Sequence, residues 1–154
     1  MTEFTDQIRI NFGGRWNSHS NYGSHFTYSL NPSIQIFDKN QNSLKFQAAY
    51  STAFIAPSLY QLFDPFSGNL DLQPEENTSF EIGLVYKLKK WDLSGTYFNR
   101  IESPSLIYDL ATYRYENATD QARYYGVEAV LWGSVDSILM LDHQMTFTGT
   151  QDGD

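Results

Sequence analysis

Two segments of the sequence carry aromatic side chains but show no strand-like alternation that would bury them. Stacked rings and tyrosine hydroxyl groups suit a large planar or chelated ligand, so binding is the chemistry that these residues suggest. Loop aromatics also commonly pack within their own loop, and both roles stay open at this point. The candidate ligand-binding residues are Tyr60, Phe63 and Phe66 in residues 55–78, and Tyr108, Tyr113 and Tyr115 in residues 101–121.

The same two segments are rich in carboxylate side chains. Such a group of acids can attract a cationic complex or Ca²⁺, whose preferred ligands are oxygen atoms. The alternative is an acidic rim that is simply solvated. The carboxylates concerned are Asp64, Asp71, Glu75, Glu76, Glu102, Asp109 and Glu116.

Signatures of catalysis and of metal binding are missing from the sequence. It contains no Gly-x-Ser-x-Gly elbow, no His-Glu-x-x-His pair and no glycine-rich phosphate loop. The histidines His19, His25 and His143 are far apart, without metal-ligand spacing, and there is no cysteine. We therefore predict no catalytic residue, no metal site, no cofactor and no enzymatic activity.

Composition limits the class of protein and of partner. The 154 residues suffice for one ordered domain, with 41% hydrophobic and 16% aromatic residues. A net charge of −8 argues against a nucleic-acid partner, because phosphate binding depends on clustered basic residues. No run of about 18 apolar residues is present, which excludes a transmembrane helix but not a membrane β-barrel, whose strands average to neutral hydropathy.

Apolar and polar side chains alternate in seven separate stretches of the sequence. In residues 43–54, for example, one parity carries Leu44, Phe46 and Tyr50 and the other carries Lys45. This pattern predicts strands with one apolar face, each of about 9–12 residues, the length that a tilted strand needs to cross a bilayer. The predicted strands are residues 7–16, 25–37, 43–54, 79–88, 91–100, 123–132 and 137–148.

The connections between these strands alternate in length. Residues 17–24, 55–78 and 101–121 are long, whereas 38–42, 89–90 and 133–136 are short. Outer-membrane barrels have short periplasmic turns and long extracellular loops, so the alternation favours a membrane barrel. The alternative is a soluble β-sandwich or small barrel that binds a ligand or protein and closes its apolar faces into a core.

Pro32 and several aromatic residues refine this expectation. Because proline cannot donate to a strand ladder, Pro32 predicts a bulge or an interruption in the middle of the second strand. Aromatic residues gather near strand ends, as in the interfacial belts of membrane barrels. These residues are Trp16, Tyr50, Phe54, Tyr86, Trp91 and Trp132.

Several motifs, in this order, resemble those of the TonB-dependent receptor family, especially its vitamin B12 and siderophore receptor branch. Residues 50–63 (YSTAFIAPSLYQLF) resemble its strand exit, and residues 68–75 (GNLDLQPE) resemble its Gly-Asn…Leu…Pro-Glu signature. Residues 80–84 (FEIGL) are similar to its Glu-x-Gly pattern, and Gly126-Val127-Glu128 follows its Gly-Val-Glu motif. Further matches lie in residues 97–108 and 115–118.

The resemblance implies a fold and a set of partners. The family barrel has about 22 strands around a plugged lumen, so residues 1–154 are expected to be a partial, all-β, antiparallel up-and-down meander from its C-terminal half, without plug or terminal strands. Expected partners are the rest of the barrel, the plug, the TonB energy transducer and the lipid of a Gram-negative outer membrane. The expected substrate is a siderophore–iron complex or cobalamin.

Four residues on the polar parity of their strands are expected to face the lumen and the plug rather than lipid. In both motifs concerned, a glycine lies two residues from a glutamate. A merely solvated strand face is the alternative for both glutamates. The four residues are Glu81, Gly83, Gly126 and Glu128.

Overall fold

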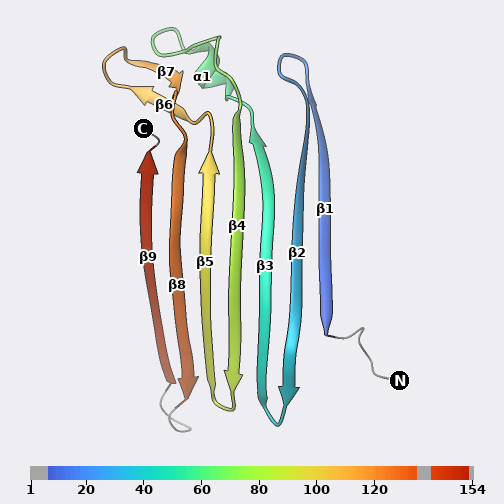
Figure 1. The fold of residues 1–154 in the computed structure, drawn as a ribbon. Coiled ribbons are helices and arrows are strands. Elements are labelled where there is room, and N and C mark those ends of the chain that lie inside the picture. The colour runs from blue at the N-terminus through green and yellow to red at the C-terminus, as the bar shows by residue number, and fades with distance from the viewer. Residues whose placement is uncertain (1–6, 135–139, 153–154) are drawn as a thin grey trace.

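The computed structural model describes residues 7–134 and 140–152, and most of them form one antiparallel sheet (Figure 1). The sheet has seven strands in the order β1-β2-β3-β4-β5-β8-β9, so strands that follow one another pair with one another. A separate two-stranded hairpin, β6–β7, is inserted between β5 and β8, and the predicted all-β meander is confirmed. The sheet strands are β1 (Ile8–His19), β2 (Gly23–Lys39), β3 (Asn42–Ile55), β4 (Glu75–Leu88), β5 (Trp91–Glu102), β8 (Ala122–Ser134) and β9 (Met140–Asp152).

The strand register gathers the apolar side chains on one face. In one row across β2, β3 and β4, Leu30 pairs with Tyr50, which pairs with Phe80. In a second row across the same strands, Ile34 pairs with Phe46, which pairs with Leu84. This apolar face is uncovered: Phe12 is 69% exposed and Phe80 is 40% exposed. Among the described residues, the only buried hydrophobic side chains are Leu62 and Leu72, and both lie outside the sheet.

An uncovered apolar face of this size needs an apolar solvent. A soluble β-sandwich would bury that face in a core, and the sheet has no second layer against it. The strands have 12 to 17 residues and thus exceed the length required to cross a bilayer. Among the described residues, no helix is long and apolar enough to span a membrane.

Two glycines let aromatic rings lie flat against a neighbouring strand. A Cβ atom at Gly133 would stand 2.1 Å from the indole ring of Trp91, its partner on the apolar face. A Cβ atom at Gly126 would stand 2.7 Å from the ring of Phe98 and 2.3 Å from the carbonyl oxygen of Phe147. The glycine of the Gly-Val-Glu motif therefore has a packing role on the polar face.

The second predicted strand is irregular at Pro32, as the sequence predicts, and again beyond it. β2 keeps one register to β3 on both sides of Pro32, but the pairs with β3 skip Asn31 and Pro32. A register shift follows between Gln35 and Phe37, and it turns Phe37 onto the apolar face opposite Leu44.

Trp132 does not belong to an aromatic belt on the apolar face. It pairs with Asp92 and Asp142, so its side chain shares the polar face with theirs. Trp91, one position away from Asp92, does lie on the apolar face near the rim formed by the short turns. The face on which a strand residue lies is decided by its odd or even position along the strand. It is not decided by the residue being aromatic or near a strand end.

The connections that the structure describes in full follow the predicted alternation with one exception; the predicted short connection at residues 133–136 lies partly outside the described residues. The turns at residues 40–41 and 89–90 are short, with positive φ at Asn40, Gln41 and Lys89, and the loops at residues 56–74 and 103–121 are long. The predicted long connection at residues 17–24 is wrong: β1 reaches His19 and β2 begins at Gly23. Most of the polar residues of this predicted connection still pair through their backbones, because polar side chains alone do not end a strand.

The ends of the described chain lie at opposite rims, as an odd number of antiparallel strands requires (Figure 1). β1 begins at the rim of the short turns, and β9 ends at the rim of the long loops. Gln151 and Asp152 belong to β9, beyond the predicted strand end at residue 148. Residues 137–139 of the predicted seventh strand, and residues 153–154, lie outside the described residues.

Candidate functional site

The first long loop begins with a short helix, α1 (Leu59–Phe63). Ser58 caps it: its Oγ atom accepts a hydrogen bond from the N–H of Gln61 at 3.3 Å, and the Gln61 side chain accepts one from the N–H of Ser58 at 2.8 Å. This reciprocal capping satisfies backbone donors that a free helix end would leave open. Pro57 lies two residues after the end of β3.

Asp64 holds the turn that follows α1. One of its carboxylate oxygens accepts hydrogen bonds from the N–H of Phe66 at 3.2 Å, the N–H of Ser67 at 2.8 Å and the Oγ of Ser67 at 2.7 Å. The carbonyl oxygen of Asp64 also accepts from the N–H of Gly68 at 2.9 Å. The bonds from Ser67 above all hold the pKa of Asp64 below its usual value.

The stability of this turn is expected to depend on pH. A carboxyl group with a lowered pKa stabilises the folded loop above its unfolded pKa of about 4 and loses that contribution as pH falls through the folded pKa. Amide exchange of residues 64–68, corrected for its intrinsic pH dependence, should therefore stay constant from about pH 7 to 5 and accelerate below about pH 4.

The matched variants are Asp64→Asn and Asp71→Asn, one in the turn and one further along the same loop. Asp64→Asn should remove most of the pH dependence of exchange, whereas Asp71→Asn should keep it, because Asp71 accepts none of the bonds in this turn. Equal pH dependence in both variants would show that Asp64 does not control the turn.

The second long loop contains a small hairpin of β6 (Leu106–Asp109) and β7 (Arg114–Asn117). Asp109 closes its turn by accepting hydrogen bonds from the N–H of Ala111 at 2.9 Å and the Oγ1 of Thr112 at 3.0 Å. These bonds, first of all the one from Ala111, lower the pKa of Asp109. Tyr113 has a positive φ of 57° in this turn.

The two long loops are joined to each other by hydrogen bonds. The N–H of Tyr115 donates to the carbonyl oxygen of Ser67 at 3.0 Å, and the side chain of Asn69 donates to the carbonyl oxygen of Tyr115 at 2.9 Å. The Asn117 side chain accepts from the N–H of Gln73 at 2.7 Å and donates to its carbonyl oxygen at 2.9 Å. Residues more than 40 positions apart in sequence thus form one structural unit, which we call the loop cap (residues 56–74 and 103–121).

The loop cap divides the six predicted ligand-binding aromatics into two groups. The rings of Tyr60 and Tyr108 both meet that of Tyr115 edge to face, with centroid distances of 6.1 and 5.2 Å. By contrast, Phe63, Phe66 and Tyr113 are 63%, 88% and 66% exposed. The contact of Tyr60 with Tyr115 joins the two loops, whereas that of Tyr108 with Tyr115 lies within the second loop. Tyr60 is itself 61% exposed, so it and the second group are open to a ligand.

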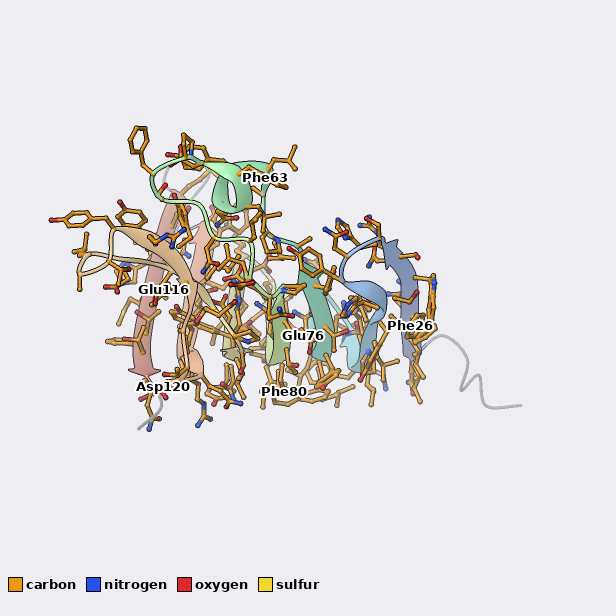
Figure 2. All side chains as sticks on the ribbon, turned by 90° about the horizontal axis from the view of Figure 1, so that it is seen from above. Phe26, Phe63, Glu76, Phe80, Glu116 and Asp120 are labelled. Carbon is orange, nitrogen blue, oxygen red and sulfur yellow. The ribbon has the colours of Figure 1, made fainter. Side chains whose placement is uncertain are left out.

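The loop cap leans toward the polar face of the sheet. Seen from above in Figure 2, Phe63 lies on the side of the sheet opposite to Phe26 and Phe80, which belong to the apolar face. In a closed barrel, the polar face is the inner one, so the exposed aromatics would stand at the mouth of the lumen.

The carboxylates of the loops do not form a metal site in the part of the chain that the structure describes. There, no group of three or more histidine and acidic side chains could hold an ion. Several of the acids have other partners: Asp64 and Asp109 close turns, and Glu75 accepts a hydrogen bond from the N–H of Leu106 at 2.6 Å. A carboxylate of Glu76 lies 3.6 Å from the ring of His25.

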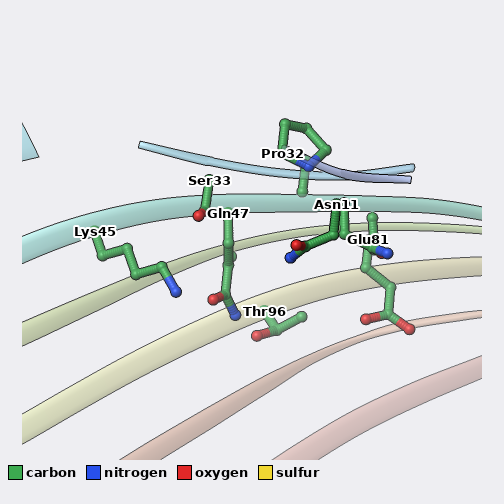
Figure 3. Close-up of a pocket in the computed structure, with 11 residues that line it drawn as sticks. Asn11, Pro32, Ser33, Lys45, Gln47, Glu81 and Thr96 are labelled. Atoms are coloured by element: carbon green, nitrogen blue, oxygen red, sulfur yellow. The ribbon is translucent and has the colours of Figure 1, made fainter. Parts of the chain in front are cut away.

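The structure puts Glu81, Gly83, Gly126 and Glu128 on the polar face, the face on which the sequence analysis expects them. Glu81 pairs with Phe98, which pairs with Gly126, and Gly83 pairs with Thr96, which pairs with Glu128. A hollow of about 260 Å³ lies nearby and is lined by Asn11, Lys45, Gln47, Glu81 and Thr96, whose side chains point to the same side (Figure 3). Whether a plug contacts them stays a prediction.

The sequence analysis did not identify the role of some residues of the loop cap. Leu72 is fully buried at 0% exposure, and Asn117 holds the two loops together; both lie in segments that resemble family motifs, but neither was singled out as a site residue. Leu59, Leu70 and Leu110 add exposed apolar surface to the cap, at 76%, 68% and 75% exposure. The Gly-Asn-Leu-Asp-Leu-Gln-Pro-Glu segment is the one signal that covers Asn69, Leu70 and Leu72.

A family model and curated proteins match this sequence. The model described as TonB dependent receptor-like, β-barrel, matches residues 2–154. The vitamin B12 transporter BtuB of Vibrio cholerae serotype O1 (strain O395) is 32% identical over 116 residues, covering 74% of this chain and 18% of that protein. The iron-regulated outer membrane virulence protein of the same strain is 28% identical over 176 residues, covering 95% of this chain and 26% of that protein.

A solved structure shows the same fold. The siderophore receptor PirA from Pseudomonas aeruginosa matches with a TM-score of 0.83 at 24% identity, over 96% of this chain and 30% of that chain. The chain thus spans less than a third of the length of each of these relatives.

Proposed function

Because the chain belongs to the TonB-dependent receptor β-barrel family, we propose that it forms part of the wall and of the ligand-binding mouth of a receptor for active uptake of a large, scarce nutrient. Its place is the outer membrane of a Gram-negative bacterium, where proteins of this family reside. The family consists of receptors and transporters rather than enzymes.

The loop cap carries this proposal. It joins two loops that lie far apart in sequence, leans toward the polar face and presents Phe63, Phe66 and Tyr113 to solvent. A rigid aromatic surface binds planar or chelated ligands at a low entropic cost, because its rings are already ordered. The substrate class that fits best is a siderophore–iron complex or cobalamin, both of which are bound by relatives according to their names.

The wall of a receptor needs partners on three sides. Its two edge strands, β1 and β9, would pair with further strands of a larger barrel, since an open edge invites pairing. Its polar face, with Glu81 and Glu128, would contact a plug domain through which the TonB transducer acts. Its apolar face would contact outer-membrane lipid.

Ligand binding provides the direct test. In the complete receptor barrel that contains these strands, replacing Phe63, Phe66 and Tyr113 together by alanine should lower the affinity for the bound nutrient by about tenfold or more, since each aromatic contact contributes about 0.5–1.5 kcal/mol. The measurement is binding of a panel of ferric siderophores and of cyanocobalamin, followed by uptake in cells with and without TonB.

The matched control is Phe26→Ala. Phe26 is also an exposed aromatic near the rim of the long loops, but it lies on the apolar face. This variant should leave nutrient affinity within about twofold of the parent value. Uptake that does not require TonB, or binding of neither ligand class, would refute the proposed function.

A further inference from the structure

We propose that the apolar face carries a specific site for an anionic glycerophospholipid of the leaflet next to the short turns. The proposal goes beyond nutrient uptake and rests on the proposed function only in taking the sheet to be a membrane wall. It combines a hollow for an acyl chain with a group of lysines for the headgroup phosphate.

The hollow lies on the apolar face and measures about 650 Å³. The bottom of the hollow is formed by a row of paired residues across β4, β5 and β8, namely Leu84, Gly95 and Ala129. The hollow is deep there because Gly95 and Ala129 have small side chains. Its walls are larger side chains from the next row toward the short turns, namely Phe37, Leu44, Tyr86 and Leu93. All of these strands have neighbours on both sides, so the hollow does not result from an open edge of the sheet.

A polar and aromatic row borders the hollow on the side of the short turns. This row crosses β2, β3, β4 and β5 and consists of Lys39, Asn42, Leu88 and Trp91, each paired with the next. It lies two residues along the strands, or about 7 Å, from the row that contains Phe37 and Leu44. A tryptophan and a lysine at this depth match the interface between acyl chains and headgroups, where both residue types are favoured.

Three lysines surround this border. The turns that hold Lys39, Lys89 and Lys90 adjoin each other, because the N–H of Lys89 donates to the carbonyl oxygen of Gln41 at 3.0 Å. All three lysine side chains are exposed. Clusters of lysine at the membrane surface attract anionic lipid headgroups.

Two carboxylates that the structure describes near these turns, Asp38 and Asp92, lie on the other face. Asp38 pairs with Ser43 on the polar face, and Asp92 there forms an ion pair with Lys87 at 3.6 Å. Lys39 shares the apolar face with Asn42 and Leu88, so neither Asp38 nor Asp92 lies beside it on that face, whereas Lys87 on the polar face is paired with Asp92. Lys89 and Lys90 lie in the turn at the end of this row. Positive charge beside an apolar hollow is the arrangement that fits an anionic phospholipid rather than a neutral one.

The test compares lipid retention by the complete receptor barrel in native mass spectrometry, during titration with phosphatidylglycerol and with zwitterionic phosphatidylcholine. The variant Lys39→Gln/Lys89→Gln/Lys90→Gln should weaken phosphatidylglycerol binding at least fivefold and abolish the preference over phosphatidylcholine. The charge-matched control Arg9→Gln/Lys45→Gln/Lys87→Gln, on the polar face, should stay within twofold of the parent.

A second variant tests the hollow itself. Gly95→Leu should displace the acyl chain and weaken binding of both lipids; a Cβ atom at Gly95 comes no nearer than 4.0 Å to the carbonyl oxygen of Glu128, so the strand tolerates it. Equal phosphatidylglycerol retention by the lysine variant and its control, or no effect of Gly95→Leu, would mean nonspecific annular lipid and overturn the proposal. Nutrient uptake is measured separately, so failure of the receptor function remains distinguishable.

Discussion

Replacing Ile82 by arginine is expected to lower the free energy of unfolding of the receptor barrel by about 2–4 kcal/mol, the cost of arginine at the bilayer midplane on the lipid side of a membrane barrel. Ile82 lies near the middle of β4, pairs with Ala48 and Tyr97 on the apolar face and is 37% exposed there. In a bilayer, the guanidinium group would meet acyl chains, and the apolar faces of the adjacent strands β3 and β5 carry no carboxylate to pair with it. The measurement is guanidinium chloride unfolding in lipid vesicles.

The matched control is Gln47→Arg, which adds the same charge on the polar face of β3. Gln47 lines the polar hollow and pairs with Gly83, whose missing side chain leaves room for a longer one. We expect its free energy of unfolding to change by less than about 0.5 kcal/mol, as for ordinary surface substitutions. If Ile82→Arg were tolerated as well as Gln47→Arg, the apolar face would not contact lipid.

Alternation predicts strands well because it records two different solvents on the two faces of a sheet. Every predicted strand overlaps an observed one, and the pairings of Leu44 and Tyr86 follow the predicted parity. Strand ends are less predictable: β2 continues beyond Phe37 to Lys39 through an irregularity at residues 35–37. One extra residue there reverses the faces, so Phe37 faces lipid although it has the parity of Gln35.

The loop cap is the part that alternation could not reveal. Its interior depends on contacts between residues far apart in sequence, such as Asn117 with Gln73 and Tyr115 with Ser67, and one sequence contains no record of which distant residues meet. Aromatic residues outside any strand pattern drew attention to both loops, and their role in ligand binding stays a prediction. It could not show that Tyr115 is held by hydrogen bonds and ring contacts while Phe66 stays exposed.

Because the two loops form one unit, a change in one should loosen both. Leu72→Ala removes a fully buried side chain of the first loop, and truncating a buried leucine costs about 2–5 kcal/mol. Since 1.4 kcal/mol corresponds to a factor of ten, opening of the loop cap should become at least about 30 times more frequent. Hydrogen exchange of the backbone amides, followed by mass spectrometry in the complete barrel, measures this opening.

The exchange should accelerate in residues 62–73 and equally in the hairpin of residues 106–117, because Ser67, Asn69 and Gln73 hold that hairpin. Leu70→Ala is the matched control, the same substitution two positions away at a side chain that is 68% exposed. It should leave both segments protected. If Leu72→Ala loosened only its own loop, the hairpin would be independently stable, and the ligand-binding aromatics would then sit on two separate loops rather than on one preformed surface.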